Sequence, residues 1–417
     1  MSRRYRVLLV SDAYAPMIGG AERATASVAA NLQAREHAVA VATAWQPGLP
    51  ERQVVDGVDV HRIRDLTARM QWISEDPRKH VPPPFPDVEA TLRFRRLVKE
   101  FRPDVIHSYG WLTYSCATSI ARGRVPLVLS IQDYGNFCAV RTMLHMDREP
   151  CSGPAARKCL ACAARHYGAV KGTVAVAGVL GSRRMLTRAA GALLSNSEYT
   201  HSAAWNHLLG RGARIAQGSA ADLVMPPLGD GALDAPPDHE LLARLPDRYI
   251  LFVGALRRMK GLPELLEAYG RLTSPPALVL VGTPEIDTPG RFPPGVVALG
   301  PVGHATVMGA WDRAVFGVFP SASPEPFGLV VHEAMSRGRA AIGTTPGGHA
   351  EMIVDGETGL LVPHGDVDAL TRAMRRLLDD PALCERLGEA GRRRAERLAG
   401  EHAIDRLEEL YEAAVAA

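Results

Sequence analysis

The sequence predicts an α/β protein made of two units, each with a parallel sheet covered by helices. Short apolar runs alternate with longer amphipathic stretches, a rhythm typical of parallel sheets. The rhythm breaks in the Pro- and Gly-containing segment 229–247 and restarts with an apolar strand at Tyr249. With 417 residues, the chain is also longer than one ordinary core needs. We therefore expect two domains, 1–235 and 236–417, the second ending in helices.

The expected strands are the apolar runs themselves. Ligands of such folds bind at the carboxyl ends of the strands. We therefore expect binding residues in the loops after the strands, and two sheets that face a central cleft. The runs are 7–10, 38–43, 58–63, 105–107, 127–131 and 193–196 in the first half, and 249–253, 278–281, 296–299, 315–319 and 341–344 in the second.

Composition narrows the classes of function. The 48 basic and 45 acidic side chains give a formal net charge of +3, which does not indicate a nucleic-acid partner. The apolar run Val7–Val10 is too short for a signal peptide, and no stretch approaches the ~18 apolar residues that span a bilayer. We expect a cytoplasmic protein without a transmembrane segment. Val174–Leu180, flanked by cations, reads as a buried helix segment, with peripheral membrane contact as the alternative.

The loop after Val253 is the first candidate site. It holds Gly254 and three cations, Arg257, Arg258 and Lys260, before an apolar-periodic run that predicts a helix. Cations and backbone N–H groups at a helix start suit a diphosphate. Basic residues in such loops are mostly solvated, so this loop alone does not define a site.

A pair of carboxylates, Glu325 and Glu333, is the second candidate. The first lies in a Pro-flanked loop and the second in the helix that follows, where they could accept hydrogen bonds from hydroxyl groups at two ends of one ligand. The amides of Phe327, Gly328 and Leu329 could meet an anion between them. An acid that offsets the helix dipole, with a chance Glu333, explains the same residues equally well.

These segments carry a resemblance to a known family. Glu325-x7-Glu333, the loop ending in Lys260-Gly261, and the segment that opens with Pro346-Gly347-Gly348 look like the C-terminal domain of family-4 retaining glycosyltransferases of GT-B fold. The opening strand with its Gly19-Gly20 loop, and Pro103–Ser108, resemble the N-terminal domain. The resemblance implies two Rossmann-like domains, the first acceptor-binding and the second nucleotide-sugar-binding.

The resemblance also implies roles for the site residues. Glu333 would bond the nucleotide ribose, and Glu325 with the three amides at 327–329 would hold the donor sugar and diphosphate. Lys260 would stabilise the negative charge of the departing diphosphate. No catalytic cofactor or metal is then needed, because fixed cations and amides stabilise the leaving group. The donor site would further include Gly254, Arg258, Gly19 and Gly20, the glycines allowing close approach of the backbone.

Two positions depart from the family pattern. Arg commonly follows the glycine of the donor loop, and here that residue is Ala255, so we expect Arg257 or Arg258 to substitute, with Arg257 favoured as the catalytic cation by its proximity to the strand end. A His-Asp pair often follows the strand at 127–131, and here the pair is Gln132-Asp133. Gln132 cannot titrate, which excludes a histidine base there and leaves Asp133 as the catalytic candidate.

The sequence thus predicts transfer of a sugar from a nucleoside-diphosphate sugar to a hydroxyl acceptor, which can be a glycan, a lipid-linked glycan or a small natural product. The resemblance implies retention of anomeric configuration, with a donor phosphate oxygen as the base. A sugar-nucleotide epimerase and a non-catalytic sugar-nucleotide-binding protein are the alternatives. An NAD-binding enzyme is disfavoured, because no Gly-x-Gly-x-x-Gly follows a strand.

A cysteine-rich insertion is expected at 138–162. Cys138, Cys151, Cys159 and Cys162 include a Cys-x2-Cys pair typical of tetrahedral zinc. A structural zinc site, free or disulfide-linked thiols, and a redox cluster all remain open.

Overall fold

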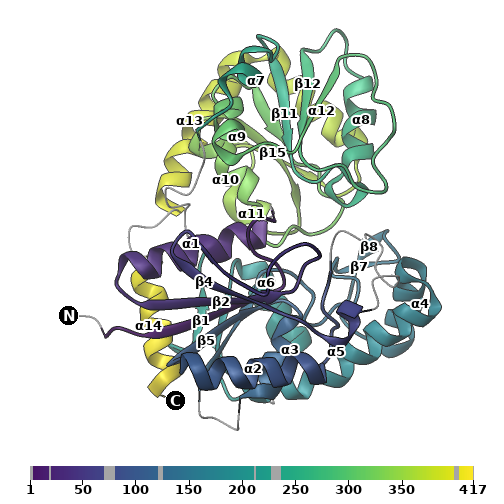
Figure 1. The fold of residues 1–417 in the computed structure, drawn as a ribbon. Coiled ribbons are helices and arrows are strands. Elements are labelled where there is room, and N and C mark those ends of the chain that lie inside the picture. Colours follow the sequence, from purple (N-terminus) through teal and green to yellow (C-terminus); the bar gives the residue numbers. More distant parts are fainter. Residues whose placement is uncertain are drawn as a thin grey trace. The chain divides into compact units, whose positions relative to one another are not determined.

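The computed structural model describes residues 3–17, 20–69, 80–120, 125–210, 213–226, 236–398 and 403–416. The chain divides into two compact units, Met1–Gly231 with Glu401–Ala417 and Ala232–Gly400. Both are helix-covered, parallel-rich sheets (Figure 1), so the predicted α/β class is confirmed.

The first unit is built on an eight-stranded sheet of order β10-β9-β6-β5-β1-β2-β4-β3. Its pairs are parallel except β3 with β4, where Arg52–Val55 runs antiparallel. The strands are β1 (Arg6–Ser11), β2 (Ala38–Ala44), β3 (Arg52–Val55), β4 (Val58–Ile63), β5 (Val105–Tyr109), β6 (Leu127–Ile131), β9 (Ala190–Ser195) and β10 (Asp222–Val224).

Helices cover both faces of this sheet because β1 is apolar on both sides. Val7 and Leu9 pack in one core with α1 and α14, and Leu8 and Val10 in another with α2, α3 and α5 (Figure 1). The helices of this unit are α1 (Gly20–Ala34), η1 (Leu66–Arg69), α2 (Val88–Phe101), α3 (Leu112–Ser119), α4 (Ala156–Tyr167), α5 (Ala169–Ala189), α6 (Glu198–Ala204), η3 (Trp205–Leu209) and α14 (Ala403–Ala416).

The last helix, α14, differs from the sequence-based expectation. We expected all residues after 235 to belong to the second domain, but Leu407, Leu410 and Tyr411 are buried in a core of the first sheet. The Tyr411 hydroxyl also lies 2.8 Å from Nδ1 of His107 on β5. The chain therefore returns to the first unit after completing the second.

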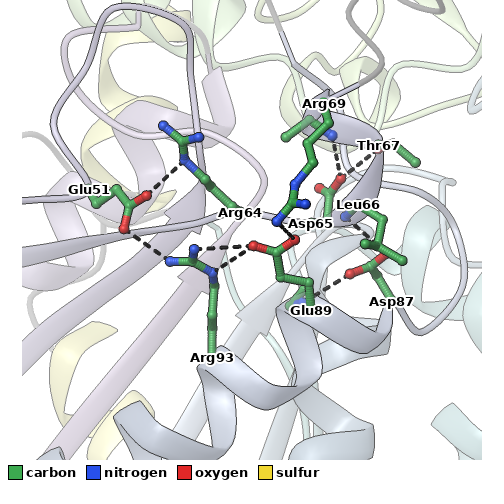
Figure 2. Close-up of polar contacts among 11 residues, drawn as sticks. Glu51, Arg64, Asp65, Leu66, Thr67, Arg69, Asp87, Glu89 and Arg93 are labelled. Carbon is green, nitrogen blue, oxygen red and sulfur yellow. Dashed lines mark hydrogen bonds and ion pairs between the residues drawn. The ribbon is translucent and has the colours of Figure 1, made fainter.

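A polar network joins the segment after β4 to the start of α2 (Figure 2). The Asp87 carboxylate caps α2 by accepting from the N–H of Ala90 at 2.9 Å, and it also accepts from the N–H of Leu66 at 3.2 Å. Arg93 bridges Glu51 and Glu89 at 3.0 and 3.2 Å. The buried cap stabilises the start of α2 more than the exposed ion pairs do, because water screens exposed pairs.

The second unit contains a six-stranded, wholly parallel sheet of order β13-β12-β11-β14-β15-β16 among its described residues. One face packs against α8 and α12, and the other against α9 and α10. Its strands are β11 (Tyr249–Val253), β12 (Ala277–Val281), β13 (Val296–Gly300), β14 (Phe316–Val318), β15 (Ala340–Thr345) and β16 (Leu360–Pro363). Its helices are α7 (His239–Ala243), η5 (Arg258–Lys260), α8 (Leu262–Gly270), α9 (His304–Trp311), α10 (Leu329–Ser336), α11 (His349–Met352), α12 (Val367–Asp379) and α13 (Pro381–Leu398).

Candidate active site

An ion pair lies at the carboxyl edge of the second sheet. Lys260 follows β11, and Glu325 follows β14, its neighbour in the sheet. The Lys260 ammonium donates to both carboxylate oxygens of Glu325, at 2.7 and 2.9 Å. Two candidate residues 65 positions apart are thereby brought into contact, because neighbouring parallel strands end at the same edge.

Glu325 is held ionised. Its side chain is 16% exposed, and burial alone would raise its pKa, but Lys260, His349 and the hydroxyl of Ser321 together lower the pKa to about 2. Ser321 donates to Oε2 at 2.8 Å. No sequence motif pointed to Ser321, although it lies four residues before Glu325. The carboxylate is thus a permanent acceptor at neutral pH.

The glycine loop after β15 packs directly on the Glu325 loop. The N–H of Gly348 donates to the Glu325 carbonyl at 2.7 Å. A Cβ on Gly347 would lie 2.8 Å from the Glu325 nitrogen, and one on Gly348 would lie 2.6 Å from Cα of Phe327. Only glycines allow the two backbones to approach this closely.

Two histidines support these loops without having been predicted as site residues. His349 is buried, and its Nδ1 accepts from the N–H of Thr344 at 3.2 Å. Burial lowers the pKa of His349 to about 4, so it is neutral at pH 7. His364 contacts the carbonyls of Ser321 and Pro346 at 2.7 and 2.6 Å, which ties the loops after β14 and β15 together.

Close backbone packing also fixes the turn that carries Lys260. Gly261 has φ +74°, and a Cβ there would lie 1.8 Å from the Pro320 carbonyl oxygen. Gly254 has φ +153°, and its carbonyl oxygen would lie 1.8 Å from a Cβ on Gly282. The loops after β11, β12 and β14 therefore fit together only with glycine at these points.

The other two cations of the donor loop lie outside this ion pair. Arg257 is partly buried and Arg258 exposed, and neither side chain makes an ion pair within the described ranges. The backbone N–H of Arg258 donates to Asp287 at 2.8 Å. Both guanidinium groups are thus available to an anion, and the structure brings neither into the Lys260–Glu325 pair.

Glu333 lies on α10, away from that pair. Its side chain is 9% exposed, and Oε1 lies 3.3 Å from Nε2 of His304, the first residue of α9. His304 was not predicted. Phe327 is buried, and Gly328, with φ 97°, precedes α10 without a side-chain cap. Because glycine has no side chain, the N-cap residue of α10 makes no side-chain hydrogen bond to the first backbone N–H groups of the helix.

In the first unit, an arginine links two carboxylates at the edge of the sheet. Asp12 follows β1 and Asp133 follows β6; Arg141 Nε donates to Asp133 at 3.0 Å, and its NH1 lies 3.5 Å from Asp12. Burial raises the pKa of Asp12, with Arg141 opposing the shift. Burial opposes the charge of Arg141 too, but the two carboxylates outweigh it and raise the pKa of Arg141. Asp133 was predicted, whereas Asp12 and Arg141 were missed.

A small pocket opens at the same edge. It is lined by Ala24 and Val28 of α1 and by Tyr109, Ser130, Gln132 and Asn196 at strand ends, with Leu194, Met225 and Pro226 completing it. Gln132 thus lines a small cavity that has both polar and apolar residues in its wall. Gly20 begins α1, and Gly19 lies outside the described residues.

The four clustered cysteines occupy one region of the first unit. All are free thiols, and burial raises the pKa of Cys138 and Cys162. Cys138 and Cys159 belong to the same small core as Cys162, and Cys151 packs with Cys138 on the neighbouring core. No group of three or more His, Cys, Asp or Glu in the described part of the chain is arranged to hold a metal ion. Zinc binding here stays a prediction.

Comparison with known families identifies the class. The model of "Glycosyl transferases group 1" matches residues 238–394, and that of "Glycosyl transferase 4-like domain" matches residues 19–216. The two matches cover both units, including the Lys260–Glu325 pair and the Asp133 region. The chain belongs to the family-4 glycosyltransferases, which confirms the resemblance seen in its motifs.

Several relatives extend over the whole chain. Glycogen synthase of Mycobacterium tuberculosis H37Rv is 28% identical, over 93% of this chain and 90% of that protein. Sucrose-phosphate synthase from Thermosynechococcus elongatus has a similar fold, with a TM-score of 0.71 at 19% identity and 98% coverage of each chain. Anabaena HepE in complex with UDP-glucose has a TM-score of 0.66 at 15% identity, covering 97% and 98%. These neighbours confirm the GT-B fold.

Among the residues that the structure describes, no helix is both long and apolar enough to cross a membrane.

Proposed function

We propose that this enzyme transfers a hexosyl residue from a nucleoside-diphosphate sugar to a hydroxyl acceptor with retention of anomeric configuration and without a catalytic metal. The observation that carries the proposal is the pairing of Lys260 with Glu325 at the carboxyl edge of the second sheet. A cation and an ionised acceptor there suit the two ends of a breaking glycosyl–phosphate bond.

The donor binds at this edge in our proposal. The Lys260 ammonium and the first amides of α10 face the diphosphate, with Arg257 and Arg258 as further cations. Glu325 accepts from sugar hydroxyls, and Glu333, the fifth residue of α10, accepts from the ribose. The ionised state of Glu325 supports this role, since a carboxylate with a pKa of about 2 can only accept.

The chemistry follows from the charges that develop. Breaking the anomeric C–O bond leaves negative charge on the diphosphate and positive charge on the sugar. Lys260 stabilises the leaving group, and this term provides most of the acceleration. As the resemblance to the family implies, a phosphate oxygen of the donor removes the acceptor proton; Gln132 cannot titrate, and the buried His349 is neutral at pH 7.

The first unit binds the acceptor. Asp133, held by Arg141, accepts from an acceptor hydroxyl, and Gln132 lines the adjacent pocket. The names of relatives suggest UDP-glucose as the first donor to test, since HepE was solved with it.

A thermal-shift screen of UDP-, GDP- and TDP-sugars tests the proposal. A donor that binds the folded protein raises the unfolding temperature in proportion to ln(1 + [L]/Kd). Lys260→Ala and Glu325→Ala should each reduce the shift, while Glu357→Gln, an exposed acid of the same unit, should not. NMR of the product's anomeric proton reports retention. The donor site would be wrong if no donor shifted the unfolding temperature. Conversion of the donor into an epimeric sugar nucleotide without an acceptor would indicate an epimerase.

A further inference from the structure

The hairpin of α4 and α5 presents a surface rich in positive charge. The two helices are joined through Gly168 and contain no Asp or Glu. Their seven cations are Arg157, Lys158, Arg165, Lys171, Arg183, Arg184 and Arg188. In a chain whose basic and acidic residues are nearly balanced, this separation of charge is local to one hairpin.

Apolar side chains are exposed on the same hairpin. Val170 is 78% exposed, Val174 49% and Leu160 of α4 37%. On α5, the exposed positions recur with helical spacing from Val170 to Arg188, whereas Val176 and Val179 on the opposite side are buried. The sequence favoured a buried helix segment at 174–180, and the structure buries Val176 and Val179 but exposes Val174.

The two helices form one surface. A Cβ on Gly172 would lie 2.6 Å from the backbone of Ala163, so α4 and α5 pack directly against each other in the first unit (Figure 1). The carboxylate of Asp147 lies 3.6 Å from Arg165 of this surface. Arg157, Arg184 and Arg188 make no ion pair with any described residue.

We propose that the outward side of the α4–α5 hairpin docks on an anionic lipid bilayer. Val170, Val174 and Leu160 enter the boundary between headgroups and acyl chains, and Arg157, Arg184 and Arg188 bind lipid phosphates. Charge complementarity favours an anionic surface, and the exposed valines favour a bilayer over a nucleic acid, which would contact the cations alone. Docking would bring the first unit to a surface where lipid-linked acceptors reside. The docking proposal does not depend on the residues assigned to the donor site.

Vesicle cosedimentation of the full-length chain tests the proposal. We expect binding to vesicles containing phosphatidylglycerol, little binding to pure phosphatidylcholine vesicles, and weakening as salt rises. The variant Arg184→Ala/Arg188→Ala should bind the anionic vesicles at least tenfold more weakly, since each cation contributes about fivefold. Val170→Asp/Val174→Asp should also lose binding, including at low salt.

Matched controls separate docking from general effects of charge. Arg372→Ala/Arg375→Ala removes two exposed cations from α12, and Val54→Asp changes an exposed valine of β3; both should bind like the wild type. Unchanged circular dichroism and unfolding temperature show that each variant folds. Equal binding to neutral vesicles, equal losses in the controls, or binding to duplex DNA that needs the same arginines but tolerates Val170→Asp/Val174→Asp would each overturn the proposal.

Discussion

The Lys260 ammonium lies within hydrogen-bond distance of both oxygens of Glu325, at 2.7 and 2.9 Å. If the donor binds as proposed, its diphosphate would compete with Glu325 for the same cation. Donor binding would then redirect Lys260 toward the leaving group and leave Glu325 available to sugar hydroxyls, still bonded to Ser321.

Removing Lys260 should impair chemistry more than binding. Lys260→Ala removes the cation that we propose stabilises the leaving group, so we expect kcat to fall by about 10²- to 10³-fold with a smaller change in KM. Steady-state kinetics with the donor found by thermal shift measure this. Lys99→Ala, an exposed lysine on α2, is the control. If Lys260→Ala changed KM alone, the cation would serve binding and not the leaving group.

Arg141 should act through Asp133. Arg141→Ala removes the cation that orients Asp133 and offsets the charge of Asp12, so we expect acceptor KM to rise by about tenfold and donor affinity to stay unchanged. Because the guanidinium lowers the pKa of Asp12 against burial, that pKa should rise further in the variant. Initial rates with varied acceptor, together with donor thermal shifts, distinguish the two units. Reduced donor affinity in this variant would contradict the proposed division of roles.

The buried His349 should make stability depend on pH. The pKa of His349 is about 4 in the folded chain against about 6.5 ordinarily. As the pH falls from 6.5 to 4, the unfolded chain therefore takes up a proton on this histidine and the folded chain does not. Stability should be greatest above pH 6.5 and decline toward pH 4, by about 3 kcal/mol for this group. Urea unfolding at pH 7 and pH 5 measures the effect.

The matched variant for that experiment is His349→Asn, whose side-chain oxygen can still accept from the N–H of Thr344. It should lose less stability between pH 7 and pH 5 than the wild type. The stability of this variant should still decrease somewhat as the pH falls, because burial lowers the pKa of His107 in the first unit to about 3. His239→Asn, at an exposed site on α7, should keep the wild-type slope. An unchanged slope in His349→Asn would show that this histidine is not buried neutral.

Gly261 should tolerate no side chain. At φ +74°, with the Pro320 oxygen 1.8 Å from the position that a Cβ would take, Gly261→Ala must displace the loop after β14. We expect a loss of at least about 2 kcal/mol in unfolding free energy and a lower kcat, since Lys260 precedes this turn. Gly290→Ala is the control, because no atom lies within 4 Å of its Cβ position. Chemical denaturation of both variants measures the difference, and equal stability would refute the close packing.

The sequence predicted much of this architecture for identifiable reasons. All eleven expected strands occur, because buried parallel strands are continuous apolar runs. Glu325 and Lys260 could be placed at one edge because both follow such strands. The short β3, β10 and β16 were missed, as was the antiparallel pair of β7 (Leu144–His145) and β8 (Glu149–Pro150), since two to four residues carry too little periodicity. Ser321 and Arg141 were missed because their contacts depend on how loops fold together, and the location of α14 because an apolar helix face does not specify which sheet it covers.

That unexpected helix gives a last prediction. Leu410→Ala would leave a cavity beneath α14, where Leu410 is 1% exposed, and should destabilise the first unit by about 2–5 kcal/mol. Hydrogen exchange should accelerate in strands β5 and β9, which α14 contacts, and not in β11 or β12 of the second unit. Glu409→Ala, one residue away and exposed, should leave exchange unchanged. Faster hydrogen exchange confined to the second unit would contradict this prediction, because it would mean that α14 stabilises the second unit and not the first.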